Sequence, residues 1–383
     1  MYPRFWYWPL IVLAAALATV LALTLAPYGW NPSALFHLDQ STANQYGVPK
    51  GFVVLQEPGY DGEQYYEIAR SMPKIFDPSN WRSLATHSTI AYSYQRFLLP
   101  LTAFVITLGR DSALPYAFLL INVAALIGAC AILLRFRPRR PLYALALALC
   151  PAATVGLHFS LAEPLTLLLI TAFLVRFDGR ERLGTWDIVL LSLFVLSREV
   201  NILFVGFLLL YMLYRKRWQD AFLLLVPLLT FLTLHSLIFR IFHEIPFFWS
   251  TGKSTLPFGA IIPLLFGHAG YNMLTFSSIA LFCGFVLPAV VWTAAISWKE
   301  RRSAPFLPWA TFIFLCVMIM MPDHIWGSVT SIGRVITPVY PLFLITAAKH
   351  DTLPVRLIAV AVLVIGCVAA LGLASIHHPF TLS

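Results

Sequence analysis

The chain has 383 residues, of which 59% are hydrophobic and only 11% are charged, and its mean hydropathy is +0.79. Soluble domains carry about 25% charged residues, so this composition excludes an ordinary soluble protein. The formal net charge of +9 does not indicate a nucleic-acid partner, because the basic residues lie in short clusters between apolar runs. That pattern is typical of the cytoplasmic loops of membrane proteins. We therefore predict an integral, multi-pass membrane protein surrounded by membrane lipid.

The first apolar run follows the basic residue Arg4 and extends from Pro9 to about Pro27. Signal-peptide cores are shorter, at about 7–15 residues. We therefore expect this run to be an uncleaved first transmembrane span, with the N-terminus in the cytoplasm.

Further apolar runs follow along the whole chain. They lie at 92–108, 113–134, 141–158, 162–177, 187–197, 200–214, 220–240, 273–297, 306–321, 334–348 and 355–376. If every run crossed the membrane, the cluster Arg135–Arg140 would lie outside, against the positive-inside bias. We resolve this conflict by placing the run 92–108, which contains Arg96 and Pro100, as a helix in the outer interface.

The remaining runs predict an all-α polytopic membrane protein, a single domain over residues 1–383 with about 11 transmembrane helices. Every dense basic cluster is then cytoplasmic. Two long extracytoplasmic loops follow from this topology, 29–112 with its juxtamembrane helices and 242–272. Long outer loops over a bundle indicate chemistry or binding at the extracytoplasmic face. The compact size favours a bacterial inner (plasma) membrane.

The stretch 187–214 has the length of one long span with Arg198 and Glu199 in its middle. A charge at the bilayer centre costs about 2.5–3.5 kcal/mol, and a single span would also move Arg215–Arg217 to the outside. We therefore predict two short helices that meet near Arg198 and place both charged residues in an outward-facing cavity.

Asp61 is the first polar residue that calls for an explanation. It precedes Gly62, which permits a tight backbone turn, and a segment with helical spacing that includes Glu63 and Tyr65. A carboxylate at a helix start is stabilised by the helix dipole and stays ionised, and an accessible carboxylate can act as a general base. The alternative is that Asp61 only caps the helix.

Further ionisable groups fall on the outer side in this topology. They are Arg96, His158, Glu163, Arg198, Glu199 and, near the last spans, His324 and Arg334. Ionisable residues at membrane depth are costly and usually mark a site, and arginine suits phosphate. As alternatives, Arg96 and Arg334 snorkel to lipid headgroups, Glu163 and Arg198 form a structural ion pair, and His158 is an ordinary interfacial histidine.

Asp61 and most of these ionisable residues, though neither histidine, lie in motifs that resemble those of the GT-C superfamily of membrane glycosyltransferases. The motifs are Tyr60-Asp61-Gly62-x-x-Tyr65-Tyr66-x-Ile68-Ala69, Tyr94-Gln95-Arg96-x-Leu98-x-Pro100, Ala162-Glu163-Pro164-Leu165, Leu196-Ser197-Arg198-Glu199 and Arg334…Pro338…Tyr340-Pro341. The first is similar to the first-loop motif of bacterial cell-surface glycopolymer proteins. It is also similar to the loop of the family that adds the second mannose of GPI anchors.

The resemblance implies transfer of a hexose or pentose from a polyprenyl-phosphate donor to a glycan or glycolipid acceptor. Arg198 and Arg334, with Arg96, would bind the donor phosphate, and Asp61 would take the acceptor proton, with inversion at the anomeric carbon. Glu163 or His158 would orient the acceptor or a metal, and the pairing of Asp61 with Glu163 would permit one divalent ion, Mg²⁺ or Mn²⁺, as a cofactor. The expected substrate-binding residues are Glu63, Tyr65, His158, Glu199 and His324.

Two other functions remain open. The chain could be a transporter or flippase for a lipid-linked sugar, although such proteins usually show paired repeats and broken helices at the midplane, and we find no repeat. It could also be a non-catalytic subunit of a glycopolymer assembly system. The chain carries no phosphate-loop, His-Glu-x-x-His or Gly-x-Ser-x-Gly motif, and these would indicate nucleotide, zinc-protease or serine-hydrolase chemistry.

Overall fold

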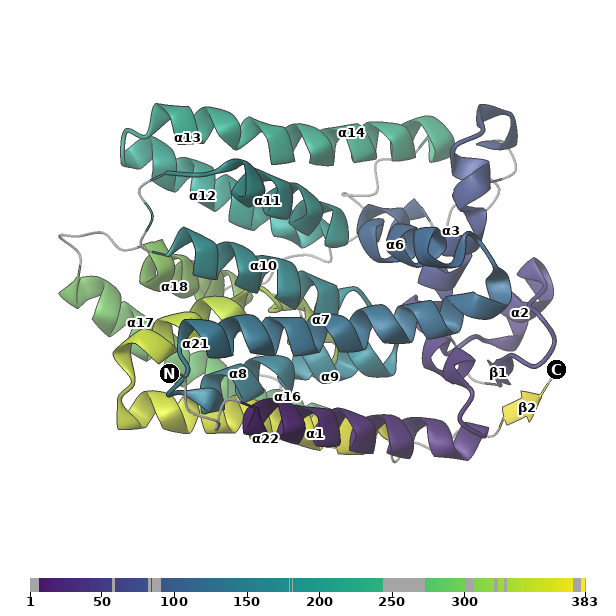
Figure 1. Cartoon of the computed structure of the whole chain (residues 1–383), viewed down its shortest axis with the longest axis horizontal. Helices are drawn as coiled ribbons and strands as arrows, with labels where there is room; N and C mark the ends of the chain where they lie inside the picture. Colours follow the sequence, from purple (N-terminus) through teal and green to yellow (C-terminus); the bar gives the residue numbers. More distant parts are fainter. Residues whose placement is uncertain are drawn as a thin grey trace.

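The computed structural model describes residues 7–56, 59–81, 84, 91–178, 180, 182–243, 273–300, 306–319, 323–326, 329–374 and 380–382. Most of these residues are helical. The long helices lie along the long axis of the molecule, and shorter elements gather at one end (Figure 1). The all-α class predicted from the composition is confirmed. The predicted second outer loop, 242–272, lies outside the described residues except at its start.

The long bundle is made of helices in chain order. They are α1 (Trp8–Leu25), α7 (Leu114–Phe136), α8 (Pro141–Ala148), α9 (Pro151–His158), α10 (Glu163–Phe177), α11 (Thr185–Ser197), α12 (Ile202–Tyr214), α13 (Trp218–Leu223), α14 (Leu225–Phe242), α16 (Met273–Leu281), the π-helical turn η9 (Phe282–Val286), α17 (Leu287–Lys299), α18 (Phe306–Ile319), α21 (Val339–His350) and α22 (Leu353–Ala374).

The shorter elements lie mainly in the predicted first outer loop. They are η2 (Ala26–Tyr28), η3 (Pro32–Phe36), α2 (Gln40–Tyr46), β1 (Val53–Leu55), α3 (Asp61–Ile75), η4 (Pro78–Asn80), η5 (Ser93–Arg96), α6 (Leu98–Thr107), η6 (Asp111–Ala113), η7 (Glu199–Asn201), α19 (Asp323–Trp326), α20 (Val329–Val335) and β2 (Phe380–Leu382).

Within the described residues, 6 helical segments are long and apolar enough to cross a membrane, judged by length and composition. They are Trp8–Tyr28, Asp111–Phe136, Pro141–His158, Trp218–Phe242, Phe276–Lys299 and Leu353–Ala374. Helices are stable in lipid because their backbone hydrogen bonds are satisfied within the segment. A multi-pass membrane protein is therefore supported. The predicted number of about 11 spans is not reached by this measure, since the other bundle helices are shorter.

The run 92–108 forms η5 and the ten-residue helix α6. At about 1.5 Å per residue, α6 is about 15 Å long, which is half the thickness of a bilayer core. Leu108 ends it in the left-handed conformation. The helix packs against α3 and α7 at the end of the bundle that holds the short elements (Figure 1). This run is thus helical, as predicted, and α6 alone is shorter than a membrane span; its predicted place in the outer interface stays a prediction.

The stretch 187–214 also folds as two short helices. α11 ends at Ser197, the 3₁₀ turn η7 follows Arg198, and α12 begins at Ile202. Arg198 itself has extended backbone angles, so the helix breaks at the charged residue.

The helix ends that border the basic clusters lie at the end of the bundle opposite the short elements (Figure 1). They are the C-terminal ends of α7, α10, α12, α17 and α21. We call this part of the molecule the basic end. Large aromatic side chains are exposed close to the helix ends at the basic end, namely Trp186, Tyr214, Trp218 and Trp298. Exposed tryptophan and tyrosine side chains are typical of the membrane–water interface.

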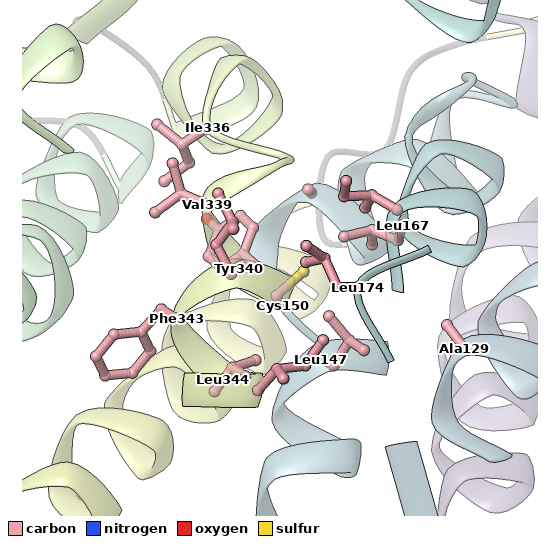
Figure 2. Close-up of a cluster of buried hydrophobic side chains, with 14 of the residues drawn as sticks. Ala129, Leu147, Cys150, Leu167, Leu174, Ile336, Val339, Tyr340, Phe343 and Leu344 are labelled. Atoms are coloured by element: carbon pink, nitrogen blue, oxygen red, sulfur yellow. The ribbon is translucent and has the colours of Figure 1, made fainter. Parts of the chain in front are cut away.

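The interior between the helices is filled by apolar side chains. Figure 2 shows Cys150, from the break between α8 and α9, among Tyr340 of α21 and Leu174 of α10. The break is also where α22 approaches most closely, because a Cβ atom on Gly366 would overlap the carbonyl of Leu149. Glycine at this position therefore sets the spacing between α22 and the α8–α9 pair.

One strand pair is an exception to the helical architecture. β1 pairs antiparallel with β2, with Val53 opposite Leu382 and Leu55 opposite Phe380. The end of the chain is thereby joined to the predicted first outer loop, at the end of the molecule opposite the basic end (Figure 1).

Candidate functional site

Charged side chains from distant parts of the sequence meet where the short elements cover the bundle. They are Asp61 at the start of α3, Arg96 at the end of η5, Glu163 at the start of α10, Arg198 and Glu199 at the α11–α12 junction, and Arg334 in α20. We call these residues the polar cluster. All of them were predicted as catalytic, phosphate-binding or substrate-binding residues.

Asp61 lies between two guanidinium groups. Its Oδ2 atom accepts hydrogen bonds from Arg96 Nη1 and from Arg334 Nη2, each at 2.7 Å. Arg334 Nη1 also donates to the Tyr60 hydroxyl at 3.1 Å. The N-cap of α3 is Tyr60, and Asp61 is its first helical residue. The interpretation of Asp61 as only a helix cap is therefore wrong.

Burial differs sharply between these partners. The side chains of Arg96 and Arg334 are 5% and 8% exposed, whereas that of Asp61 is 31% exposed. Two buried, paired arginines do not snorkel to lipid headgroups, so that alternative is also wrong. Asp61 is the most accessible carboxylate of the polar cluster.

Glu163 is completely buried and receives two cations on one oxygen. Its Oε1 atom accepts from Arg334 Nε at 2.7 Å and lies 3.0 Å from Arg198 Nη1. Arg198 Nη1 also donates to the carbonyl of Arg334 at 2.6 Å. The ion pair of Glu163 and Arg198 that the sequence left open is thus present. Two buried atoms of this pair, Glu163 Oε2 and Arg198 Nε, find no hydrogen-bond partner among the described residues.

Glu199 forms a two-point ion pair with Arg96. Arg96 Nε donates to Oε2 at 3.0 Å, and Arg96 Nη2 donates to Oε1 at 3.1 Å. The Tyr92 hydroxyl donates to the same Oε1 at 2.8 Å and accepts from Arg96 Nη2 at 2.8 Å. The Tyr65 hydroxyl accepts from Arg96 Nη1 at 3.4 Å. Such two-point pairs fix both the position and the plane of a guanidinium.

The polar cluster contains three guanidinium groups and three carboxylates, so the formal charges of the cluster sum to zero. This balance explains why charges are tolerated in a buried place, because unpaired buried ions cost several kcal/mol. Burial by itself raises the pKa of Asp61, but the charges of Arg334 and Arg96 outweigh burial and hold that pKa well below its usual range. Asp61 is therefore ionised when these arginines are its partners.

Gly62 explains how Asp61 reaches this position. A Cβ atom on Gly62 would overlap the carbonyl oxygen of Phe159 and would lie 3.0 Å from the carbonyl oxygen of Phe36. The start of α3 is thereby held against the turn that precedes Glu163. Gly62 was predicted to permit a tight turn, but its structural role is close packing of one backbone on another.

Two further predicted substrate-binding residues, His158 and Glu63, have described contacts with other groups, and a third, His324, has none described. His158 Nδ1 lies 3.2 Å from the Thr24 hydroxyl. Glu63 Oε2 accepts from the backbone N–H of Asp39 at 3.2 Å, and burial raises the pKa of Glu63 to about 7. His324 belongs to α19, but its side chain lies outside the described part of the chain.

Two tyrosines near the polar cluster were missed by sequence reasoning. Tyr60 stacks on Phe159 with a centroid separation of 4.0 Å, and the Arg334 guanidinium lies 5.4 Å from its ring centre. Tyr92 bonds both Arg96 and Glu199. The available signal was position alone: Tyr60 directly precedes Asp61, and Tyr92 lies one helical turn before Arg96.

The arrangement does not fit the divalent ion that Asp61 and Glu163 were expected to permit. The Arg334 guanidinium bonds both carboxylates and so takes the place between them that a metal ion would need. The described residues also contain no group of three or more His, Cys, Asp or Glu side chains suited to a metal. We therefore derive no chemical step through a metal.

Comparison of the chain with protein-family models, curated proteins and solved structures gives no match. The resemblance to the GT-C superfamily thus depends on the short motifs alone.

Proposed function

We propose that the protein is a membrane glycosyltransferase that moves a sugar from a polyprenyl-phosphate donor to a glycan or glycolipid acceptor at the extracytoplasmic face. The observation that carries this proposal is the position of Asp61, a partly exposed carboxylate held between the buried guanidiniums of Arg96 and Arg334. A base and phosphate-binding cations are thereby next to one another.

The proposed topology has about 11 spans, a cytoplasmic N-terminus and a location in a bacterial inner membrane. It is supported by the C-terminal ends of α7, α10, α12, α17 and α21, which border the basic clusters and lie together at the end of the bundle away from the polar cluster (Figure 1). Helices such as α11 and α12, each of 13 residues, are about 20 Å long. Each of these two helices would extend from the cytoplasmic side to the junction at Arg198, which would face outward and belongs to the polar cluster.

The donor phosphate would compete with Asp61 for the arginines. A polyprenyl-phosphate sugar is a phosphodiester with one negative charge, and arginine binds phosphate and carboxylate oxygens in the same two-point manner. Some of the N–H groups with which Arg334 and Arg96 bond Asp61 would donate to the phosphate oxygens instead. Arg198 has a buried Nε–H without a partner among the described residues and can donate to the same group.

Donor binding would thus activate the base. With Arg96 and Arg334 as partners, the low pKa of Asp61 makes it a weak base. When the phosphate takes over those cations, the effect of burial remains and the pKa of Asp61 rises. A general base is most effective when its pKa lies near the working pH.

The transfer step then balances in atoms and charge. The acceptor oxygen forms a bond to the anomeric carbon as the bond from that carbon to the phosphate oxygen breaks. The acceptor proton moves to Asp61, and the electron pair of the broken bond stays on the phosphate. The phosphate gains one negative charge as Asp61 loses one. The arginines can therefore stabilise the charge that develops on the phosphate as their interaction with the carboxylate weakens. Glu163 Oε2 is buried and has no partner among the described residues, so it could accept a hydrogen bond from a substrate hydroxyl and orient that hydroxyl.

The test is sugar transfer in membranes from a panel of radiolabelled polyprenyl-phosphate sugars. We expect transfer by the wild type, loss of at least about a hundredfold in Asp61→Asn, and full activity in Asp111→Asn. Asp111 is a matched control because its side chain is 35% exposed and pairs with Arg70 alone among the described residues.

The same assay separates the competing functions. Equal transfer by Asp61→Asn and wild type would remove Asp61 as the base. If the wild type transferred sugar from no donor of the panel, the flippase and non-catalytic-subunit functions would be favoured over the enzyme.

A further inference from the structure

A cavity of about 200 Å³ lies at the basic end, far along the bundle from the polar cluster. The ends of α10, α12, α17 and α21 and the start of α18 surround it (Figure 1). Its lining includes aromatic, basic and acidic side chains. Phe177, Tyr211 and Phe306 are aromatic, and Arg180, Arg217 and Lys349 are basic.

The aromatic side chains form one wall. The ring centres of Phe177 and Phe306 are 5.4 Å apart, and those of Tyr211 and Phe306 are 5.1 Å apart. Phe306 is buried in this contact. The wall is therefore pre-formed and apolar, and it suits the uncharged part of an amphipathic ligand.

Two of the basic side chains, Arg217 and Arg180, are incompletely paired among the described residues. Arg217 donates Nε–H to Asp220 at 2.8 Å, but its buried Nη2 has no hydrogen-bond partner among the described residues. Arg180 is 47% exposed, and its guanidinium lies 3.7 Å from Asp187, a carboxylate that Arg176 approaches more closely, at 3.1 Å.

The two carboxylates that line the cavity are Asp178 and Glu300. Asp178 accepts from Lys349 Nζ at 2.7 Å, and Glu300 lies 3.7 Å from His350 Nε2. A guanidinium offers five N–H donors, so Arg180 and Arg217 can bond further acceptor oxygens. A ligand rich in anionic oxygens would meet this need.

The depth of the cavity identifies the kind of ligand. Tyr211 is one helical turn before Tyr214, on the same side of α12, and Tyr214 is 75% exposed. Arg217 precedes the exposed Trp218, and Glu300 follows the exposed Trp298 by two residues. Exposed aromatic residues of this kind lie at the level of lipid headgroups. The cavity is therefore at the depth of the phosphates of the surrounding lipids.

We propose that this cavity is a binding site for the phosphate of an anionic phospholipid from the leaflet at the basic end. Arg180 and Arg217 would bind the phosphate oxygens, and the glycerol backbone would lie against Tyr211 and Phe306. Basic pockets between transmembrane helices bind anionic headgroups in this manner. The proposal is independent of sugar transfer at the polar cluster.

The test measures lipid retention by the full-length protein. Protein is taken from bilayers of equal phosphatidylglycerol and phosphatidylcholine into detergent, and bound lipid is counted by native mass spectrometry. We expect phosphatidylglycerol to be retained preferentially by wild type and about tenfold less by Arg180→Gln and Arg217→Gln, because a charge-assisted hydrogen bond is lost. Arg180→Gln guards against misfolding, since Arg180 is the more exposed residue.

The control is Arg139→Gln, which removes a charge from an exposed basic-end residue that does not line the cavity. Unchanged lipid retention in this variant supports the proposal. Equal retention of both lipids by the wild type, or an equal loss in Arg139→Gln, would overturn it. A third arm adds glycerol 3-phosphate. Complete displacement of the lipid at low concentration would show that a soluble phosphate compound is the preferred ligand and would overturn the lipid assignment.

Discussion

The two ends of the bundle use the same charged residue types in opposite ways. In the polar cluster, Arg96 and Arg334 are buried and bond carboxylates at 2.7 Å. At the basic end, Arg356 also bonds a carboxylate, Asp351, at 2.7 Å, yet its side chain is 56% exposed. Distance alone therefore does not separate a candidate site from a surface ion pair. Burial does separate them. Water screens an exposed ion pair, whereas each ion of a buried pair has no water and depends on its partner.

The largest expected effect is at Arg334. Arg334→Ala leaves Asp61 and Glu163 without the cation that joins them. We expect the free energy of unfolding to fall by about 3–5 kcal/mol. Arg334→Lys keeps the charge but not the two-point geometry, so its loss should be smaller.

The matched change at the basic end is Arg356→Ala, for which we expect almost no shift of the denaturation midpoint. Both variants are measured by chemical unfolding in detergent micelles. Similar shifts for Arg334→Ala and Arg356→Ala would abolish the distinction between the two ends.

An intermediate effect is expected from the packing of α3. Gly62→Ala places a Cβ atom against the carbonyl of Phe159, and overpacking of this kind typically costs about 1–3 kcal/mol. Asp61 should also move relative to its arginines, so sugar transfer should fall with stability. Gly206→Ala in α12 is the control, because a Cβ atom there would meet no atom within 4 Å. A Gly62→Ala protein as stable and active as Gly206→Ala would contradict the packing role.

The smallest effect concerns Glu63, whose pKa is raised by burial from its ordinary 4.5 to about 7. Between these values the unfolded chain has lost a proton that the folded protein keeps, so stability falls as the pH rises from about 4.5 to about 7. Allowing for solvent screening, we expect a decline of about 1–2 kcal/mol. Glu63→Gln should flatten this decline in thermal unfolding measured over that pH range. A wild-type curve as flat as that of the variant would disprove the shift.

Much of the helical framework follows from simple rules of hydropathy and charge. The break at Arg198 was predictable because a charge in the middle of a long apolar run is costly. The charge of Arg135–Arg140 led to the prediction that the run 92–108 does not cross, and the ten-residue length of α6 agrees with it. The pairing of β1 with β2 was not predictable, since three-residue strands have no clear periodic signal.

The members of the polar cluster were predictable from their cost in a membrane, but their connections were not. The sequence placed Asp61 and Glu163 on the same side, and a metal ion was a reasonable way to join two carboxylates. It could not show that Arg334, more than 170 positions after Glu163, supplies the cation instead. Such partners depend on how distant helices pack, which a single sequence does not encode locally.

The late position of Arg334 has a consequence for biosynthesis. Asp61 and Glu163 are translated first, whereas α20, which carries Arg334, follows much later in the chain. Chains emerge from the ribosome at about 5–20 residues per second, so both carboxylates wait for many seconds without this partner. A nascent or truncated chain that ends before α20 therefore holds incompletely paired acids among apolar helices. The polar cluster is therefore completed only once α20 has been made and has packed against α9.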